Sequence, residues 1–267
     1  MTKNAPPPAR LLRKLVQKIG LHPDDTVEVD FDLDGRRALV VATNAGQLDI
    51  GKPTGGFASE MTVPYYAFLD AGMDVDIASP SGGEIPVDPK SIKPIIRTGD
   101  DDRFLADDEF RAQVRSSLAI GDLDMSDYDI VFLAGGWGAA FDFGFSDALG
   151  TKITEANAAG KLIGGVCHGP LGLINATTPE GAPLVQGRKV SRVTDKQVHE
   201  LGIEMTPHHP EAELRAKGAL FESETKFRDP FANHWVVDGN LVTGQNQNAG
   251  PMVARELMQL LQDQAVS

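Results

Sequence analysis

The chain is poor in cysteine, in long apolar runs and in basic side chains. One cysteine among 267 residues excludes a framework of intrachain disulfides and is typical of a reducing compartment, so we expect a cytoplasmic protein. No apolar run reaches the ~18 residues of a membrane-spanning helix, so we expect no membrane partner. The 38 acidic and 25 basic side chains give a net charge of −13, which disfavours nucleic acid as a partner.

The start of the chain differs in charge from the rest. Residues 1–18 contain no acidic side chain and five basic ones, namely Lys3, Arg10, Arg13, Lys14 and Lys18. The segment lacks the apolar core and the cleavage site of a secretory signal. We therefore expect an N-terminal arm over residues 1–36 that docks on the domain or on a neighbouring subunit.

From Arg37 onward, apolar runs alternate with segments of helical periodicity. This order predicts βαβ units with short links, hence a parallel sheet. Strands are expected at 37–43, 74–79, 128–133, 161–164 and 189–193, a hairpin at 234–243, and helices at 60–71, 146–159, 210–217 and 251–262. The expected fold is an α/β, doubly wound, mostly parallel sheet flanked by helices, flavodoxin-like, in a single domain over 37–267.

An insertion over about 80–126 interrupts this rhythm. It carries two groups of acidic side chains, at 100–102 and 107–109. The acids are contiguous rather than alternating, and no glycine lies in the middle of the group, so the pattern does not match a calcium-binding EF-hand loop. We expect a solvated helical insertion.

The single cysteine lies in the segment Gly165-Val166-Cys167-His168-Gly169, between an apolar strand and a helix-like run. The pattern G-x-C-x-G is the layout of a nucleophile elbow, with sulfur in place of a hydroxyl. The flanking glycines suit a turn with no room for a Cβ atom, and the following helix N-terminus should stabilise a thiolate. The alternative is a buried small hydrophobe, but the glycine bracket and the adjacent His168 favour a reactive thiol.

Three loops should meet at the carboxyl ends of the strands. They contain Glu60, the pair Gly135-Gly136, and Cys167. Backbone N–H groups of His168 and of the Gly135-Gly136 turn are candidate oxyanion donors. Buried beside the sulfur, Glu60 would have a raised pKa and could shuttle a proton, although a glutamate at this position can also simply interact with the helix dipole.

The segment His209-Pro210-Glu211 matches the H-P-E triad segment of class I glutamine amidotransferases. A hairpin and a long helix still follow it here, whereas that motif lies near a chain end, so we expect a decoy. The pair His208-His209 has no third ligand at suitable spacing, so no metal and no cofactor is expected.

Three segments together resemble the ThiJ/PfpI superfamily, which has the class I glutamine amidotransferase-like fold. They are the segments at 134–138, 166–170 and 238–246. The segment 55–64 and the insertion are similar to the branch of stress-response chaperones with glutathione-independent glyoxalase (glyoxalase III) activity. This resemblance implies a lyase acting on methylglyoxal, a homodimer, Cys167 as nucleophile, Glu60 as its hydrogen-bonded acid and His168 as a general acid/base.

The chain departs from this family pattern at two positions. Trp137 stands where a histidine is usual, and Val198 falls where an acid usually orients the histidine; Asp195 and Glu200 are out of register. With Gly135 and Gly136, Trp137 is a candidate for the substrate pocket. The indole of Trp137 favours an apolar ligand, so isonitrile hydration and amide cleavage remain alternative activities. A third alternative is a holdase or a redox sensor that catalyses no reaction.

Overall fold

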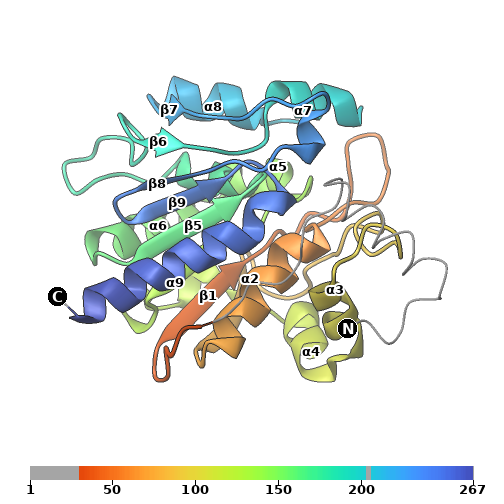
Figure 1. The fold of residues 1–267 in the computed structure, drawn as a ribbon. Helices are drawn as coiled ribbons and strands as arrows, with labels where there is room; N and C mark the ends of the chain where they lie inside the picture. Colours follow the sequence, from red (N-terminus) through yellow and green to blue (C-terminus); the bar gives the residue numbers. More distant parts are fainter. Residues whose placement is uncertain (1–29, 203–205, 267) are drawn as a thin grey trace.

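The computed structural model describes residues 30–202 and 206–266. Within them, a seven-stranded sheet has the order β3-β2-β1-β4-β5-β9-β8, parallel throughout except for the antiparallel pair β8–β9 (Figure 1). The strands are β1 (Arg37–Val41), β2 (Asp74–Ser79), β3 (Leu118–Ala119), β4 (Ile130–Leu133), β5 (Leu162–Val166), β8 (Trp235–Asp238) and β9 (Leu241–Gly244). The expected doubly wound, mostly parallel sheet is confirmed.

Helices cover both faces of the sheet because its strands are buried on both sides. In β1, Ala38 and Val40 belong to one apolar cluster, with residues of α2 (Ala58–Asp70) and α9 (Gly250–Val266). The alternate residues Leu39 and Val41 belong to a second cluster, with α6 (Asp147–Ala158). The period-2 alternation of side chains along the strand thus assigns each helix to a face.

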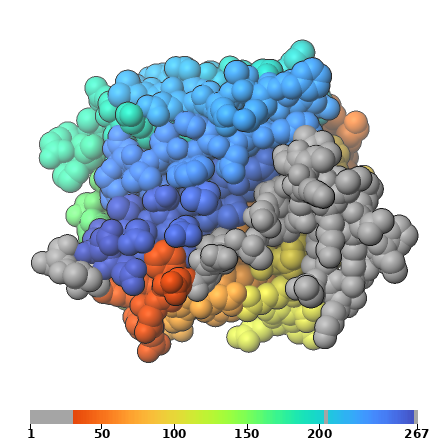
Figure 2. Space-filling model, viewed as in Figure 1, coloured from red at the N-terminus to blue at the C-terminus, as the bar shows by residue number. Residues whose placement is uncertain are grey.

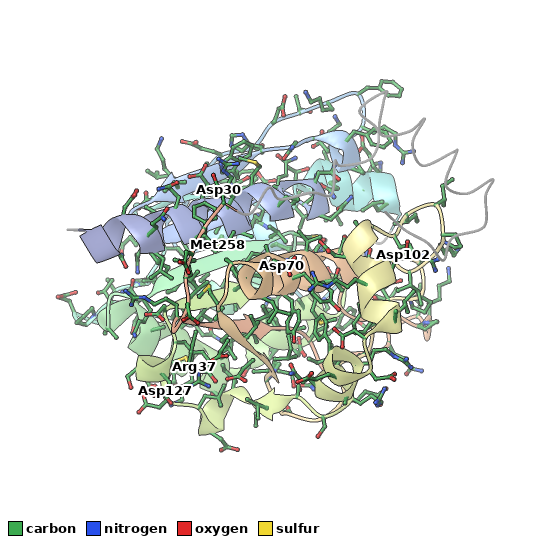
Figure 3. The ribbon with its side chains drawn as sticks, turned by 60° about the horizontal axis from the view of Figure 1, so that its bottom comes forward. Asp30, Arg37, Asp70, Asp102, Asp127 and Met258 are labelled. Atoms are coloured by element: carbon green, nitrogen blue, oxygen red, sulfur yellow. The ribbon has the colours of Figure 1, made fainter. Side chains whose placement is uncertain are left out.

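The C-terminal helix α9 lies along the sheet in front of β5 and beside α2 (Figure 1). Its fully buried Met258 belongs to the same apolar cluster as Phe68 of α2 and is labelled in Figure 3. In the space-filling view, the C-terminal residues, coloured blue, occupy much of the visible face (Figure 2). The last quarter of the chain therefore closes one side of the core.

The remaining elements are short. A second, two-stranded sheet pairs β6 (Lys189–Val190) with β7 (Leu220–Phe221), so the strand expected at 189–193 ends early. The helices are α3 (Gly99–Ala106), α4 (Asp108–Arg115), α5 (Ala139–Asp142), α7 (Asp195–Leu201) and α8 (Pro210–Ala216), with 3-10 helices at Ile120–Asp122, Met125–Asp127, Phe143–Phe145, Gly169–Leu173, Asp229–Phe231 and Gln247–Ala249. Helix α7 was not expected.

The insertion is helical, but its acidic groups are not uniformly solvated as expected. Asp101 is fully buried, and its Oδ1 accepts a hydrogen bond of 2.7 Å from Thr62 Oγ1 on α2. Asp101 also completes a capping box with Thr98 at the start of α3. Asp102, labelled in Figure 3, is buried as well and pairs with Arg97 at 2.6 Å. Asp101 thus connects the insertion to α2, whereas the Asp102–Arg97 pair lies within the insertion itself.

The expected N-terminal arm lies almost wholly outside the described residues, because the described part begins at Asp30. The arm and the domain boundary at 36/37 stay predictions. Among the described residues, no helix has the length and apolar character needed to cross a bilayer.

Candidate active site

The site lies where three adjacent parallel strands, β1, β4 and β5, end. Backbone hydrogen bonds tie the loops that follow them: Phe57 N donates to Gly135 O at 3.2 Å, and Gly138 N donates to Gly55 O at 3.2 Å. A Cβ atom on Gly135 would lie 2.6 Å from Val166 O and would also collide with a carboxyl oxygen of Glu60. The absence of a side chain at Gly135 therefore lets the three loops converge as the topology predicts.

Cys167 occupies the turn after β5 in a strained conformation. Its φ is 57°, the only positive φ of a non-glycine residue in the described part of the chain. Only glycine adopts this region readily, so the conformation marks a site held by its surroundings. A Cβ on Gly169 would collide with the carbonyl oxygen of Leu133, whereas one on Gly165 would meet its nearest atom at 3.1 Å. The strained elbow is present, and Gly169 is its more constrained glycine.

Burial raises the pKa of the Cys167 thiol, whereas the sequence predicted a thiolate stabilised at the elbow. The backbone N–H groups of Gly136 and His168 face the sulfur and favour the thiolate. Burial and the nearby Glu60 carboxyl outweigh them and raise the thiol pKa well above its usual value. The element after the elbow is only the 3-10 helix Gly169–Leu173, so the dipole of a full α-helix is not available to lower the pKa.

Glu60 lies in the first turn of α2, and its side chain is 1% exposed. Burial raises its pKa to about 8, opposed in part by the Cys167 thiol and the backbone N–H of Gly135. Neither carboxyl oxygen makes a well-formed hydrogen bond to any other described group. Glu60 therefore keeps its proton at neutral pH beside the sulfur, as the sequence predicted, and the pair titrates as a unit.

His168 is buried and neutral. Its Nδ1 lies 3.3 Å from Cys167 Sγ, while Nε2 is buried without a hydrogen-bond partner among the described residues. Burial lowers the pKa of His168 to about 3, with further lowering by the charges of Arg192 and His209. The adjacent imidazole thus reaches the sulfur, and no described carboxylate orients it from the other side.

The carboxylate that the family pattern places near residue 198 has no substitute in the described structure. Val198 on α7 is buried in an apolar cluster. Glu200 uses its Oε2 to accept from Asp229 N at 2.8 Å, and Asp195 heads the first turn of α7. Neither acid forms a hydrogen bond with His168.

Apolar side chains pack against Cys167. Trp137 packs against His168 with ring centroids 4.6 Å apart. Trp137, Cys167 and three further buried apolar side chains form one cluster. We call this set the apolar wall: Leu48, Trp137, Val193 and Val198.

Arg192 is a component that the sequence did not indicate. It is 0% exposed, and its Nη1 donates to Val193 O at 3.3 Å, while Nε and Nη2 lack partners among the described residues. Burial lowers its pKa to about 9, so it remains a cation. It stacks on Phe221 at 5.1 Å, and the next residue, Val193, donates from its backbone N to Cys167 O. No motif marks this position; the sequence shows only an arginine within the strand expected at 189–193.

The segment at 208–211 lies closer to the site than expected for a decoy. His209, at the start of α8, is near enough to His168 to lower its pKa. His208 instead points to Glu213, with 3.1 Å between Nδ1 and Oε1. Across the described residues, no group of three or more histidine, cysteine or acidic side chains has an arrangement suited to a metal ion.

Comparisons with known proteins place this geometry in context. The chain is 30% identical to glyoxalase 3 of Candida albicans over 221 residues, covering 78% of this chain and 90% of that protein. It is 28% identical to a glutathione-independent glyoxalase of Schizosaccharomyces pombe, covering 85% and 98%.

Solved structures agree with these sequence matches. The Rapid Encystment Protein of Francisella tularensis superposes with a TM-score of 0.79 at 28% identity, covering 85% of this chain and 99% of that one. Glyoxalase III of C. albicans superposes with a TM-score of 0.72 at 27% identity, covering 84% and 97%. The family profile itself matches residues 56–260, so the chain belongs to the DJ-1/PfpI family.

Proposed function

We propose that the protein is a glutathione-independent glyoxalase that converts 2-oxoaldehydes of the methylglyoxal class to 2-hydroxy acids. The observation that carries the proposal is a buried, protonated carboxyl, Glu60, set against the Cys167 thiol at a strained elbow. A proton donor and acceptor beside the nucleophile is what an internal proton transfer requires. The relatives named as glyoxalases, which match most of the chain, support the same activity.

The reaction is an internal oxidation and reduction, in which one carbon of the substrate is oxidised and its neighbour is reduced. The Cys167 sulfur bonds to the aldehyde carbon, and the thiol proton passes to the aldehyde oxygen. The protonated carboxyl of Glu60 donates its proton to the ketone oxygen while its other oxygen takes the proton on the hemithioacetal carbon, which gives an enediol. The carboxyl then returns that proton to the former ketone carbon and takes the hydroxyl proton of the hemithioacetal carbon. The ketone is thereby reduced to an alcohol, the hemithioacetal carbon is oxidised to a thioester, and Glu60 is again protonated. Water cleaves the carbon–sulfur bond, releasing the 2-hydroxy acid and restoring the thiol. No external electron carrier is needed.

The other predicted site residues have roles that follow from their positions. The backbone N–H groups of Gly136 and His168 face the sulfur and would donate to the oxyanion formed on attack. Gly135 leaves room for Glu60. The neutral imidazole of His168, 3.3 Å from the sulfur, would carry the thiol proton.

The test compares wild type with Cys167→Ser. Purified protein is incubated with methylglyoxal without glutathione, and lactate is followed by NMR. We expect lactate from wild type and none above the buffer rate from Cys167→Ser, with matching thermal unfolding midpoints as the control for folding. A folded wild type that forms no 2-hydroxy acid from methylglyoxal or from a larger 2-oxoaldehyde such as phenylglyoxal would remove the glyoxalase assignment.

A second candidate, isonitrile hydration, is favoured by the apolar wall around the thiol. The same two proteins are therefore incubated with a small isonitrile, and formamide is measured. Formamide from wild type without lactate from methylglyoxal would support this candidate. If neither product forms and suppression of client aggregation survives Cys167→Ser, the protein is a holdase.

Three finer properties complete the proposal. We assign the reaction to the lyase class, the assembly to a homodimer and the setting to a cytoplasmic stress response. Size-exclusion chromatography with light scattering tests the dimer, and a fluorescent fusion tests the compartment.

A further inference from the structure

Cys167 belongs to a cluster of apolar side chains. Of the apolar wall, Leu48 comes from the loop after β1, Trp137 from the loop after β4, Val193 from the segment after β6, and Val198 from α7. The partly buried Phe141 packs against the same cluster. Four separate segments thus bring hydrocarbon to one side of the nucleophile.

Part of this wall is within reach of a bound molecule, because Leu48 and Trp137 retain some exposed surface, whereas Val193 and Val198 are only 0% and 2% exposed. Leu48, Trp137 and Cys167 keep 6%, 8% and 8% of their surface exposed, whereas most of the apolar core is fully buried. Two members replace polar groups of the family pattern: Trp137 stands where a histidine is usual and lies against His168, and Val198 stands where an acid usually orients the histidine. Leu48 and Trp137 therefore form the part of the wall that a substrate would meet when its aldehyde carbon reaches the sulfur, and Val193 and Val198 belong to the same cluster.

The polar groups beside the thiol carry no charge at neutral pH. Glu60 is protonated because of its burial, and His168 is neutral for the same reason. The buried cation Arg192 lies over the Phe221 ring of β7, and it is within electrostatic range of Cys167 and His168. A substituent that enters this space exchanges water for hydrocarbon, which favours apolar groups.

We infer that the substrate is a 2-oxoaldehyde whose carbon substituent is apolar and larger than methyl, bound against the apolar wall. This inference rests on the proposed glyoxalase function and adds to it the substituent that the site selects. The reacting carbons are handled by Cys167 and Glu60, while the wall binds the remainder of the molecule. Selectivity should therefore reside in kcat/KM ratios between aldehydes that share the same reacting carbons.

The first experiment measures kcat/KM for three probes: phenylglyoxal, methylglyoxal and 3-hydroxy-2-oxopropanal, which is polar and close to methylglyoxal in size. We expect phenylglyoxal to exceed methylglyoxal by at least ~10-fold, because single methylene groups in apolar pockets change kcat/KM by ~10–200-fold. The hydroxylated probe should be the poorest substrate.

The three aldehydes also differ in their intrinsic reactivity. Comparing the same aldehydes between wild type and variants cancels that difference. Val198→Thr adds a hydroxyl to the wall at nearly constant volume, and Val236→Thr makes the same change on β8, outside the wall. We expect Val198→Thr to lower the phenylglyoxal-to-methylglyoxal ratio by ~5-fold or more, while Val236→Thr leaves it unchanged. Leu48→Ala, in a loop, gives a second wall variant should Val198→Thr fail to fold; unfolding midpoints of all variants are recorded.

The outcomes separate the two proposals. A ratio that falls in both wall variants and not in Val236→Thr supports the inference. A wild type that prefers methylglyoxal or the hydroxylated probe, or a ratio that the wall variants do not change, overturns it while the glyoxalase function stands. Absence of turnover of all three aldehydes by folded wild type overturns the glyoxalase function itself.

Discussion

At the scale of single residues, the site is governed by burial. Desolvation raises the pKa of Glu60, raises that of the Cys167 thiol and lowers that of His168. All three groups are consequently neutral near pH 7, so a single proton transfer between two of them would create an ion pair in a poorly solvated space, and a second, coupled transfer is needed to keep the site neutral. Arg192 is the exception, because it keeps its charge there.

Arg192 gives a prediction at this scale. Replacing it by methionine removes the cation whose repulsion lowers the pKa of His168, so that pKa should rise. It should remain below the ordinary value of 6.5, because burial is the larger cause. NMR titration of labelled histidine measures the shift, and Arg111→Met on the exposed face of α4 is the control. An unchanged titration of His168 would place Arg192 out of electrostatic range.

At the scale of elements, close approach of backbones positions the nucleophile. The elbow after β5 contacts the end of β4 at Gly169, where no Cβ fits. Helix α2 starts at Ala58, so its first turn delivers Glu60 to the same point. The site thus depends on strand ends and helix starts rather than on long loops.

Gly169→Ala should destabilise the protein by ~2–4 kcal/mol, because its methyl group would collide with the carbonyl oxygen of Leu133. Gly250→Ala is the matched control: Gly250 has helical φ of −50°, and no atom lies within 4 Å of the position of its Cβ. The free energy of unfolding of Gly250→Ala should exceed that of wild type by ~0.5–1 kcal/mol. Urea unfolding measures both. Equal stability of Gly169→Ala and wild type would contradict the crowding argument.

The elements also show what the sequence could and could not predict. The apolar strands, the cysteine elbow and the raised pKa of Glu60 followed from pattern and topology. Helix α7 was missed although Thr194 caps it and Gly202, with φ of 68°, ends it, because seven residues carry little periodicity. The raised pKa of the thiol and the role of Arg192 could not be predicted, because both depend on burial by residues that are distant in the sequence.

At the scale of the whole molecule, the buried site groups make stability depend on pH. Unfolded Glu60 ionises near 4.5, whereas folded Glu60 keeps its proton up to about 8. Stability therefore falls as pH rises through that window. Unfolded His168 takes a proton near 6.5 and the folded form only near 3, so stability also falls as pH drops through that window.

Glu60→Gln tests the first of these effects. An uncharged amide has no ionisation to suppress, so the variant should gain ~2–3 kcal/mol relative to wild type between pH 5 and pH 7. Denaturant unfolding at several pH values measures the difference. The exposed Glu84 provides the control, because Glu84→Gln should run parallel to wild type. Parallel curves for Glu60→Gln would show that Glu60 ionises normally in the folded state.

The left-handed backbone conformation of Cys167 affects which variants a stability screen of a mutant library would enrich. Of all residues, glycine fits a φ of 57° with least strain, so Cys167→Gly would relax the turn while removing the thiol. A screen that scores only folding or thermal resistance would therefore enrich inactive molecules at this position. A library built on this scaffold needs a turnover readout at every round to retain the sulfur.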